Sequence, residues 1–436
     1  MEWHLSKYTM FTKPPDCNFI VAVNLMKNTQ TILYPEEISK LINFKELNQE
    51  EPLFKKFKKQ GLVINYDELA IIQAMNKYSI LNNRWVSLTI CPTLGCNFDC
   101  PYCFENHKSG KMSEETQNKI IDFTKQILEM VNGKGISITW FGGEPLLAPE
   151  IIDSLSQKFI EFANSKKIKY GASIITNGYF LNQKNVDMLF KNKVMYYQIT
   201  LDGIYETHDK TRHLVNGNST FEVITENLRL VKIPGVINIR HNVYNDNKKE
   251  IPILEKLVKN LAKQSGNNIN YYSAIVARNP ANHLDEQVNY LNEEDSCKIT
   301  ILRDTKQIPH CKSYFCGAET LNTFTIDDKG RLYKCWEDVD KPERSFGIVG
   351  EWNPKNPFFT SNNPDILANY LNLGNLFNDE ECLNCILLPF CVGNCPSKKM
   401  YSYKSCLPYK NNIDEFALKL AEKALEKWKI KNKVKE

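Results

Sequence analysis

The sequence predicts an α/β protein with a parallel sheet in the middle of the chain, a small domain before the sheet and a cysteine-rich region after it. Three observations support this prediction. Between residues 86 and 276, strand-like apolar runs alternate with segments of helical period. Residues 1–85 hold a hairpin pattern followed by helical patterns. Residues 277–410 lose the alternation and hold nine of the 14 cysteines.

The first 85 residues predict a hairpin followed by helices. Apolar runs at 19–23 and 31–34 flank a short polar turn, which is typical of a β-hairpin. Pro35, followed by apolar residues at helical spacing, predicts the start of a helix. A second helix is expected to end at Gly61, and a short strand follows at 62–64.

The middle of the chain predicts a sheet of six parallel strands with five crossover helices. We expect the strands at residues 86–90, 136–141, 172–175, 196–201, 236–244 and 269–276. We expect the helices at 114–130, 150–163, 184–190, 221–230 and 251–261, and a separate amphipathic helix near the end of the chain at 412–430. Polar or glycine-containing motifs follow four of the strands, and in a barrel of parallel strands that end is where sites form.

Charge and hydropathy limit the possible partners. There are 55 Lys and Arg residues against 51 Asp and Glu, a net charge of +4, which gives no reason to expect nucleic acid or membrane binding. No window has the 18 consecutive apolar residues of a membrane span, and the first residues lack the pattern of a signal peptide. We therefore expect a cytoplasmic protein, in which clustered cysteines more often bind metal than form disulfides.

The first cysteine group has the spacing CxxxCxxC, at Cys96, Cys100 and Cys103. Three thiolates can hold three irons of a [4Fe–4S] cube and leave the fourth iron open to a small molecule, whereas a structural zinc site needs four ligands. The alternatives are a zinc site that takes His107 or Cys91 as its fourth ligand, or cysteines without a metal. Cys91 precedes the motif and is expected to be a buried packing thiol.

Three further motifs follow the next strands in order. Gly143 and Glu144 follow the second strand, where glycines allow a ligand close to the backbone and the carboxylate can accept from an ammonium group. Asn177 follows the third strand, Thr200 ends the fourth, and Arg212 comes shortly after it. Each motif alone is weak, because Gly-Gly-Glu-Pro is often just a turn and an arginine is usually solvated.

Together, these motifs resemble the radical S-adenosylmethionine (SAM) superfamily over residues 86–280. The resemblance implies a partial (β/α)6 barrel with catalytic cysteines Cys96, Cys100 and Cys103 around the cluster and SAM on its open iron. It also implies SAM contacts from the matching positions, which are Tyr102 for the adenine, Gly143 and Glu144 for the methionine amino group, and Asn177, Thr200 and Arg212 for other parts of SAM. One electron from the cluster cleaves SAM, and the 5′-deoxyadenosyl radical removes a substrate hydrogen.

The second cysteine set resembles the SPASM domain, which carries auxiliary [4Fe–4S] clusters. Its spacing is Cys316-x13-Gly-x4-Cys335, then Cys382-x2-Cys385-x5-Cys391-x3-Cys395, and finally Cys406. With Cys311 there are eight thiolates, which suffice for two cubes and make three clusters in the chain. The family pattern assigns Cys311, Cys316, Cys335 and Cys395 to auxiliary cluster I, and Cys382, Cys385, Cys391 and Cys406 to auxiliary cluster II.

Two features of this set stay open. Some thioether-forming relatives leave one iron of cluster I without a protein ligand, so the role of Cys311 is not fixed. The local spacing of Cys382, Cys385, Cys391 and Cys395 also fits zinc. Cys17 and Cys297 fit no pattern and are expected to be packing or surface thiols.

Two substrate classes compete. Residues 1–85 loosely resemble the winged-helix leader-recognition domain of ribosomal-peptide maturases, whereas anaerobic sulfatase maturases begin almost at their cluster motif. Sulfatase maturases also place an aspartate base directly after the cysteine that matches Cys335, and this chain has Trp336 there, with Glu337 and Asp338 close by. A non-enzymatic electron carrier or scaffold is a third reading, but it leaves the Gly-Gly-Glu motif unexplained.

The sequence therefore predicts a peptide maturase in four parts: a leader-recognition domain at 1–85, a radical SAM core at 86–280, a SPASM domain at 281–410 and a C-terminal helix at 411–436. The expected partners are a precursor peptide with a leader and a flavodoxin, ferredoxin or reductase as electron donor. The expected product is a thioether from a substrate cysteine sulfur to a carbon of the same peptide, with a carbon–carbon crosslink left open.

Overall fold

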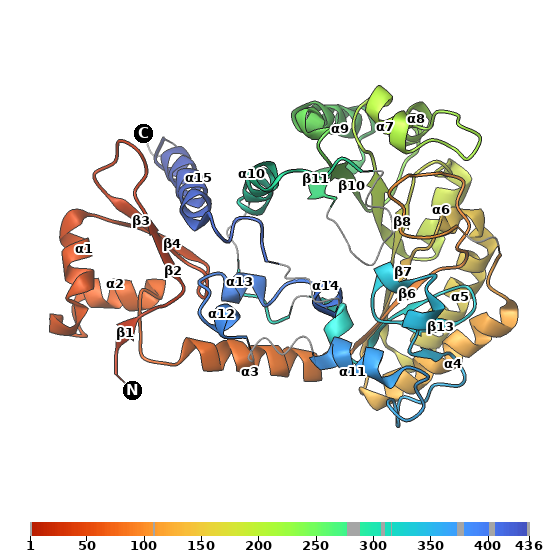
Figure 1. Ribbon diagram of the computed structural model, residues 1–436, viewed down its shortest axis with the longest axis horizontal. Helices are drawn as coiled ribbons and strands as arrows, with labels where there is room; N and C mark the ends of the chain where they lie inside the picture. Colours follow the sequence, from red (N-terminus) through yellow and green to blue (C-terminus); the bar gives the residue numbers. More distant parts are fainter. Residues whose placement is uncertain are drawn as a thin grey trace. The chain divides into compact units, whose positions relative to one another are not determined.

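The computed structural model describes residues 2–107, 110–276, 288–306, 310–314, 316–372, 379–400 and 406–433 (Figure 1). The chain divides into two compact units. The barrel unit consists of Asn83–Leu291 and Gly317–Asn372. The terminal unit consists of Met1–Asn82, Asn292–Cys316 and Leu373–Glu436.

This division runs across the expected domain boundaries. Residues 281–410, expected as one SPASM domain, contribute segments to both units. The C-terminal segment 411–436 belongs to the same unit as the N-terminal 82 residues. The four-part organisation stays a prediction, and the two units give the frame for the site.

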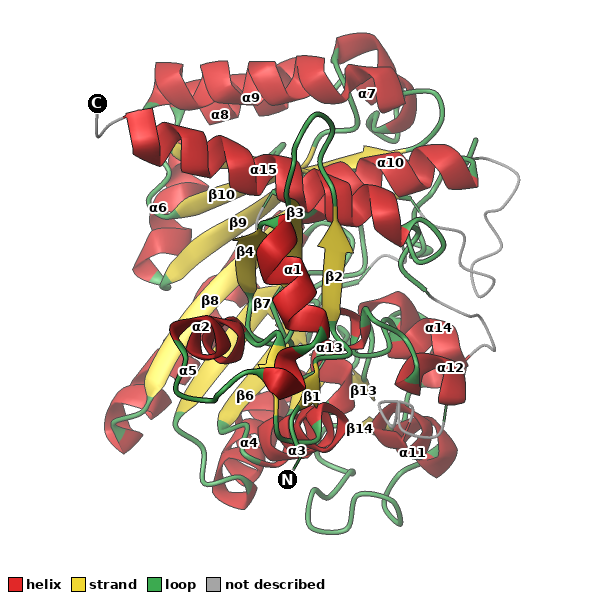
Figure 2. Cartoon of the chain, turned by 90° about the vertical axis from the view of Figure 1, so that its left-hand side faces the viewer, coloured by secondary structure: helices red, strands yellow, loops and turns green. Residues whose placement is uncertain are grey.

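The barrel unit is built on one sheet of nine strands in the order β11-β10-β9-β8-β7-β6-β12-β13-β14. The six predicted strands are all present and are mutually parallel: β6 Trp85–Ile90, β7 Gly135–Trp140, β8 Lys169–Thr176, β9 Val194–Thr200, β10 Val236–Val243 and β11 Asn268–Ile275. Figure 2 shows β6 to β10 side by side. The predicted α/β fold with a central parallel sheet is confirmed.

The expected crossover helices are also present, and the structure adds one. They are α4 Glu114–Met130, α5 Pro149–Lys166, α6 Gln183–Lys191, α8 Phe221–Leu230 and α9 Ile251–Ser265, and the added helix is α7 Tyr205–Thr211. The helices bury one face of the sheet, where Ile136, Ile138 and Trp140 of β7 are fully buried. Ser137 and Thr139, which alternate with them, are only half-buried and point to the opposite face.

Three strands from the cysteine-rich region complete this sheet. They are β12 Thr323–Ile326, β13 Arg331–Tyr333 and β14 Gly347–Ile348, and α11 Pro364–Asn372 follows them. β12 pairs parallel to β6, with Thr323 opposite Ser87, while β13 and β14 are antiparallel. These strands are not among those that the sequence predicts. Because Cys335 comes two residues after β13, the sheet positions this cysteine.

The terminal unit contains a three-stranded antiparallel sheet in the order β2-β3-β4. Its strands are β2 Thr9–Thr12, β3 Ile20–Asn24 and β4 Thr29–Leu33, and a separate pair joins β1 His4–Leu5 to β5 Val63–Ile64. The predicted hairpin is confirmed as β3 and β4, with Ile20 opposite Leu33 and Asn24 opposite Thr29. The helices of the N-terminal segment are α1 Pro35–Ile42, α2 Pro52–Gln60 and α3 Glu68–Leu81.

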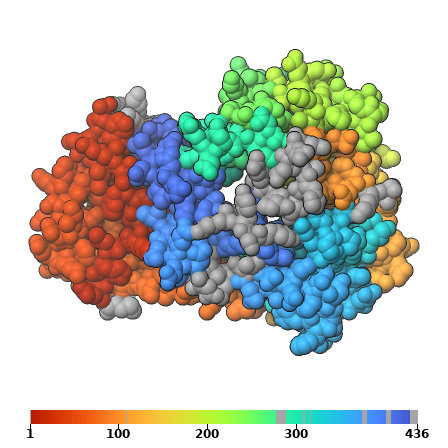
Figure 3. Space-filling model, in the orientation of Figure 1, coloured from red at the N-terminus to blue at the C-terminus, as the bar shows by residue number. Residues whose placement is uncertain are grey.

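Both faces of the three-stranded sheet are covered. Ala22 of β3 packs with Phe54 and Phe57 of α2 on one face. Val21 and Val23, which alternate with it, belong to a second apolar cluster with helix α15 Ile413–Lys433. In Figure 3 the red N-terminal residues and the blue C-terminal helix lie against each other. The remaining helices of this unit are α10 Glu293–Asp304, α12 Glu380–Leu383, α13 Leu388–Cys391 and α14 Pro396–Met400.

No helix within the described ranges is both long enough and apolar enough to cross a bilayer.

Candidate active site and cluster cysteines

The first cysteine group lies in the loop after β6, and main-chain hydrogen bonds hold this loop in place. Phe98 forms an isolated antiparallel bridge with Leu214. The Asp99 amide donates to the His213 carbonyl at 3.1 Å, and the Val215 amide donates to the Asn97 carbonyl at 3.0 Å. The loop is therefore paired with the segment that directly follows Arg212.

The glycines after β7 make room for this same loop. A side chain built on Gly143 would place its Cβ 2.2 Å from the Gly95 carbonyl oxygen, and one on Gly142 would lie 2.3 Å from the Thr93 carbonyl oxygen. The Glu144 amide donates to the Gly95 carbonyl at 2.8 Å. The sequence analysis expected these glycines to admit a ligand, but in the structure they admit the backbone of the cysteine loop.

Glu144 is fully buried and joins the ends of two strands. Its carboxylate accepts from the Thr176 hydroxyl at 2.8 Å, from the Asn177 amide at 2.8 Å and from the Leu146 amide at 2.9 Å. Burial raises the pKa of Glu144 to about 7, although these hydrogen bonds oppose the rise. A carboxylate has about four lone-pair sites, so three chain donors leave one site for a ligand.

Asn177 also connects to the cysteine loop. Its side-chain amide donates to the Asn97 side-chain oxygen at 2.8 Å, and its own oxygen accepts from the Tyr179 amide at 2.9 Å. The structure thus places Asn177 at the loop that carries Cys96, next to Glu144.

Tyr102 and Arg212 meet in a buried polar network with Asp202. The Tyr102 hydroxyl donates to the Asp202 carboxylate and accepts from the Arg212 guanidinium at 2.9 Å. The Arg212 guanidinium also lies over the Phe98 ring, 5.5 Å from its centre. Burial raises the pKa of Asp202, while the charge of Arg212 lowers it. The network links the third-cysteine side of the loop to the end of β9.

Thr200 is the last residue of β9 and is nearly buried. It lies opposite Arg240 in the β9–β10 register. All six predicted SAM contacts therefore lie at the cysteine loop or at the strand ends beside it.

Several buried polar atoms around this network have no hydrogen-bond partner within the described residues. They are Asp202 Oδ1, Arg212 Nε and Asn97 Nδ2. Buried polar atoms without a partner are rare, and they require an explanation such as a missing ligand. One acceptor and two donors at one end of the sheet fit a small ligand that carries both charged and polar groups, as SAM does.

The three cysteines of the loop are partly exposed, and burial still raises the pKa of each thiol, to about 12 for Cys96. The Cys103 sulfur lies 3.1 Å from His107 Nε2. In the part of the chain that the structure describes, no three His, Cys, Asp or Glu side chains surround a single point as one metal ion requires. A cube binds each thiolate through a different iron, so its ligands do not need that arrangement.

Cys91 is fully buried, in a small cluster with Leu94, Tyr333 and Val339. Burial raises its pKa well above the ordinary value. This is the packing environment that the sequence analysis expected. Cys297 is likewise buried in an apolar cluster, and Cys17 is partly exposed.

Four cysteines of the second set line one small cavity in the terminal unit. They are the four that the family pattern assigns to auxiliary cluster II, namely Cys382, Cys385, Cys391 and Cys406. The rest of the lining includes Leu387, Leu388 and Gly393. Four thiols around an otherwise largely apolar cavity are the donor set that a Cys₄ cube needs.

The four cysteines expected at auxiliary cluster I do not all belong to one unit. Cys311, Cys316 and Cys395 are in the terminal unit, and Cys335 is in the barrel unit. The Cys311 sulfur lies 3.8 Å from the Met26 sulfur. Their assignment to one cluster stays a prediction.

Sequence reasoning missed several residues of the site. Asp202 and Asn242 contact Tyr102, and Thr176 holds Glu144. Their position in the sequence could have identified them, because each lies at or shortly after the carboxyl end of a parallel strand, where sites form. Glu105 gave no such signal. It is buried two residues after Cys103, and burial followed by the repulsion of Asp340 raises its pKa to about 8.

Comparisons with known proteins agree with this geometry. The model of the radical SAM superfamily matches residues 90–257. A cysteine-type anaerobic sulfatase-maturating enzyme of Clostridium novyi is 25% identical over 352 residues, which are 72% of this chain and 88% of that protein. The radical SAM cyclopropyl synthase TigE of Paramaledivibacter caminithermalis is 23% identical over 334 residues, 69% of this chain and 65% of that protein.

A solved structure has a similar fold. Native anSMEcpe with bound AdoMet and the Cp18Cys peptide matches 80% of this chain and 99% of its own, with a TM-score of 0.59 and 20% identity. At 20% identity, this similarity is evidence for a shared fold only. Residues 90–257 therefore form a radical SAM domain, and the superfamily of that domain uses a [4Fe–4S] cluster and SAM.

Proposed function

We propose that this enzyme is a peptide maturase. It takes a hydrogen from a ribosomally made precursor peptide and forms a thioether between a cysteine sulfur and a carbon of the same peptide. The proposal has two parts, recognition of a peptide and choice of the bond, and a different feature of the chain supports each part.

The observation that carries the choice of bond is the surroundings of Cys335. Trp336 stands where sulfatase maturases are expected to have their aspartate, and its indole N–H donates to the Thr89 hydroxyl at 2.9 Å. Asp338 is fully buried, accepts from the Tyr370 hydroxyl at 2.5 Å and pairs with Arg344 at 3.2 Å. Because Asp338 is engaged in this way, it is a poor candidate for a base that acts on a substrate cysteine.

The three-stranded sheet of the terminal unit supports peptide recognition. Helices cover both of its faces, so a peptide can meet only an edge. Within the described residues, no strand pairs with the outer side of β4. An open edge offers unpaired main-chain groups to an added strand, and alternate side chains of the peptide can then be selected. The alignment with the anSMEcpe structure covers 99% of that chain but only 80% of this one. About one fifth of this chain therefore has no counterpart there, and an additional recognition domain would account for it.

The residues of the barrel unit supply the reactive site under this proposal. Cys96, Cys100 and Cys103 would hold the cluster, while Glu144 and the polar network of Arg212 would bind SAM. When bound, the reduced cluster and SAM supply the 5′-deoxyadenosyl radical that removes a substrate hydrogen. A flavodoxin, ferredoxin or reductase would supply the electron. Three clusters are proposed in all, two of them held by the second cysteine set.

The comparisons favour two alternatives. The sulfatase-maturating relatives support oxidation of a cysteine or serine to formylglycine. The cyclopropyl synthase among the relatives supports carbon–carbon bond formation. Each alternative predicts a different product from the same first step, so product analysis separates all three.

Mass spectrometry of a precursor peptide after anaerobic turnover tests the proposal. The expected product has lost two hydrogens per bond and has one fewer cysteine that can be alkylated. A loss of two hydrogens with every cysteine still alkylated would favour a carbon–carbon link. Conversion of a cysteine to an aldehyde that reacts with hydrazides would favour formylglycine. Leader recognition is tested on the full-length chain, because residues 1–82 share an apolar cluster with the C-terminal residues and their deletion would expose it.

A further inference from the structure

Tyr8 is a buried tyrosine whose hydroxyl lacks a partner. It lies just before β2, and only 1% of its surface is exposed. Its hydroxyl has no hydrogen-bond partner within the described residues. A buried hydroxyl without a partner is unusual enough to require an explanation.

The ring of Tyr8 belongs to the apolar cluster that joins the N-terminal sheet to the C-terminal cysteine segment. The same cluster contains Leu387 and Leu388, and Cys385 and Cys391 pack against it. Burial raises the pKa of Tyr8 to about 12, with smaller contributions from Glu68, Asp67, Cys385 and Cys311, in that order. Tyr8 and two thiols of the second cysteine set, those of Cys385 and Cys391, therefore belong to the same packed region.

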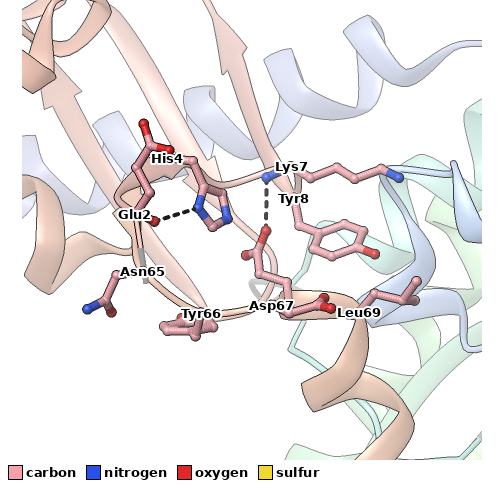
Figure 4. Close-up of a pocket in the computed structure, with 9 residues that line it drawn as sticks. Glu2, His4, Lys7, Tyr8, Asn65, Tyr66, Asp67 and Leu69 are labelled. Atoms are coloured by element: carbon pink, nitrogen blue, oxygen red, sulfur yellow. Dashed lines mark hydrogen bonds between the residues drawn. The ribbon is translucent and has the colours of Figure 1, made fainter.

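The residue before Tyr8 contacts the turn that carries Cys385. The Lys7 ammonium donates to the Leu383 carbonyl at 2.8 Å and to the Asn384 side-chain oxygen at 3.1 Å. Figure 4 shows the Lys7 ammonium and the Tyr8 hydroxyl both pointing away from Glu2 and His4. Lys7 thus holds the Cys382–Cys385 turn beside the start of the N-terminal sheet.

The carboxylate nearest to this region does not bond Tyr8. Glu68, which lines the pocket of Figure 4, accepts from the Ser6 hydroxyl at 2.7 Å and from the Lys7 amide at 2.9 Å. No hydrogen bond joins its oxygens to the Tyr8 hydroxyl. Thiols of the second cysteine set that pack against the same apolar cluster, Cys385 among them, are therefore candidate acceptors for the hydroxyl.

We propose that, once auxiliary cluster II is bound, the Tyr8 hydroxyl donates a hydrogen bond to the Cys385 thiolate, so that the N-terminal sheet helps to set the reduction potential of that cluster. The inference rests on the proposed function, which places a cluster on these cysteines. The four cysteines that line the cavity, Cys382, Cys385, Cys391 and Cys406, are the donor set that such a cluster needs. Hydrogen bonds to cluster sulfurs stabilise the reduced, more negative form and raise the potential.

Cys385 is a better acceptor than Cys311 for two reasons. Within the described residues, Cys385 packs against the apolar cluster that contains Tyr8, whereas Cys311 is not part of that cluster. The contacts of Lys7 also fix the Cys385 turn, whereas the Cys311 sulfur lies against the Met26 sulfur at 3.8 Å. Tyr8 is then a positioning and tuning residue, because it acts through the cluster ligand rather than on the substrate.

Redox titration of the reconstituted full-length protein, followed by electron paramagnetic resonance (EPR), tests this proposal. Tyr8→Phe removes the hydroxyl and keeps the ring in the apolar cluster. We expect a roughly tenfold smaller equilibrium constant for reduction of one auxiliary cluster, which for one electron is a potential about 59 mV lower. Tyr66→Phe is the matched control, because Tyr66 lines the pocket of Figure 4 and burial and Glu68, but no cysteine, raise its pKa. Its potentials should equal those of the wild type.

Two further measurements locate the effect. The first uses a variant that lacks cluster II because Cys382, Cys385, Cys391 and Cys406 are all changed to Ala. In this variant, Tyr8→Phe should leave the reduction potentials of the remaining clusters unchanged. A shift of those potentials would overturn the assignment of Tyr8 to cluster II. Pulsed EPR of the wild type should show an exchangeable proton coupled to the reduced auxiliary cluster, which deuterium oxide removes.

The outcomes separate this inference from the proposed function. A wild-type protein with no cluster on these cysteines would overturn both. A protein that carries the cluster but shows the same potential in the wild type and in Tyr8→Phe would overturn only the role of Tyr8. If Tyr8→Phe binds less iron, the wild-type proton coupling decides, and its absence overturns the proposal.

Discussion

The two cysteine regions of this chain are held in place by different means. In the barrel unit, main-chain hydrogen bonds to the segment after Arg212, close contact with Gly143 and the hydrogen bond from the Glu144 amide to the Gly95 carbonyl together fix the loop. In the terminal unit, three of the four cysteines around the cavity, Cys382, Cys385 and Cys391, lie on or next to the four-residue helices α12 and α13. These helices pack onto the N-terminal sheet mainly through apolar side chains. The first region is shaped by its own polar network, whereas the second has few such constraints.

This difference suggests how each region depends on metal. A loop with its own hydrogen bonds keeps its shape before the cluster binds. A segment of single-turn helices gains much of its order from ligation, because metal binding to cysteines contributes directly to folding. The experiments below perturb one region and follow the other.

The largest expected effect follows from removing the first cluster alone. Changing Cys96, Cys100 and Cys103 together to Ala should abolish formation of 5′-deoxyadenosine, because no open iron then binds SAM. The second cysteine set should still hold about eight irons, since two cubes need eight thiolates. Any 5′-deoxyadenosine above the protein-free background would show that this loop is not the SAM-cleaving site.

Gly143→Ala should damage the first region without changing a cysteine. Its new Cβ would lie 2.2 Å from a backbone oxygen that cannot move without shifting the loop. We expect a loss of about 1–3 kcal/mol in unfolding free energy and about four irons fewer per chain. Gly171→Ala on β8 is the matched control, because a side chain there would meet no atom within 4 Å. Equal iron contents in the two variants would contradict the role given to Gly143.

Iron removal should affect the two units differently. After chelation, hydrogen exchange should become much faster in α12, α13 and the part of α15 that shares their apolar cluster. The amides of the cysteine loop that pair with the segment after Arg212 should exchange only slightly faster. An equal loss of protection from hydrogen exchange in both units would contradict the conclusion that the second cysteine region depends more on bound metal than the first.

A smaller effect concerns the pH dependence of the unfolding free energy of the barrel unit. Burial raises the pKa of Glu144 from 4.5 to about 7, so the folded state binds its proton more tightly than the unfolded state. The unfolding free energy should therefore fall as the pH rises from 4.5 to 7, by up to about 3 kcal/mol for this group. Glu144→Gln should lack this part of the slope in iron-free protein, and Glu129→Gln, an exposed change on α4, should keep it. A wild-type slope in Glu144→Gln would contradict the assignment.

Periodicity predicted the regular parts of the fold well. The six parallel strands and the β3–β4 hairpin were predicted because each has a clear apolar run bounded by turn residues. The strands β12 to β14 were missed because they have only two to four residues, and because β12 joins the sheet through β6, which is distant in sequence. The division of residues 281–410 between two units was missed for the same reason, since a local pattern does not identify a distant partner.

The site was predicted in position but less well in detail. The motifs correctly placed Glu144, Asn177 and Arg212 near one loop, because all follow the ends of parallel strands. The close approach of the Thr93–Gly95 backbone to Gly142 and Gly143 was not predicted, since spacing does not reveal which backbone lies next to a glycine, and the SAM contact of Gly143 stays a prediction. The contact of Tyr102 with Asp202 joins positions 100 residues apart, and no sequence pattern links the two.

The central claim is that two separate cysteine sets hold three clusters, one on the barrel loop and two on the second set. Iron and sulfide analysis of the anaerobically reconstituted chain tests it most directly. The account predicts about 12 irons and about 12 sulfides per chain, with about eight of each remaining in the Cys96, Cys100 and Cys103 triple variant. A wild-type chain with only about four irons, or with zinc on the second set, would contradict it.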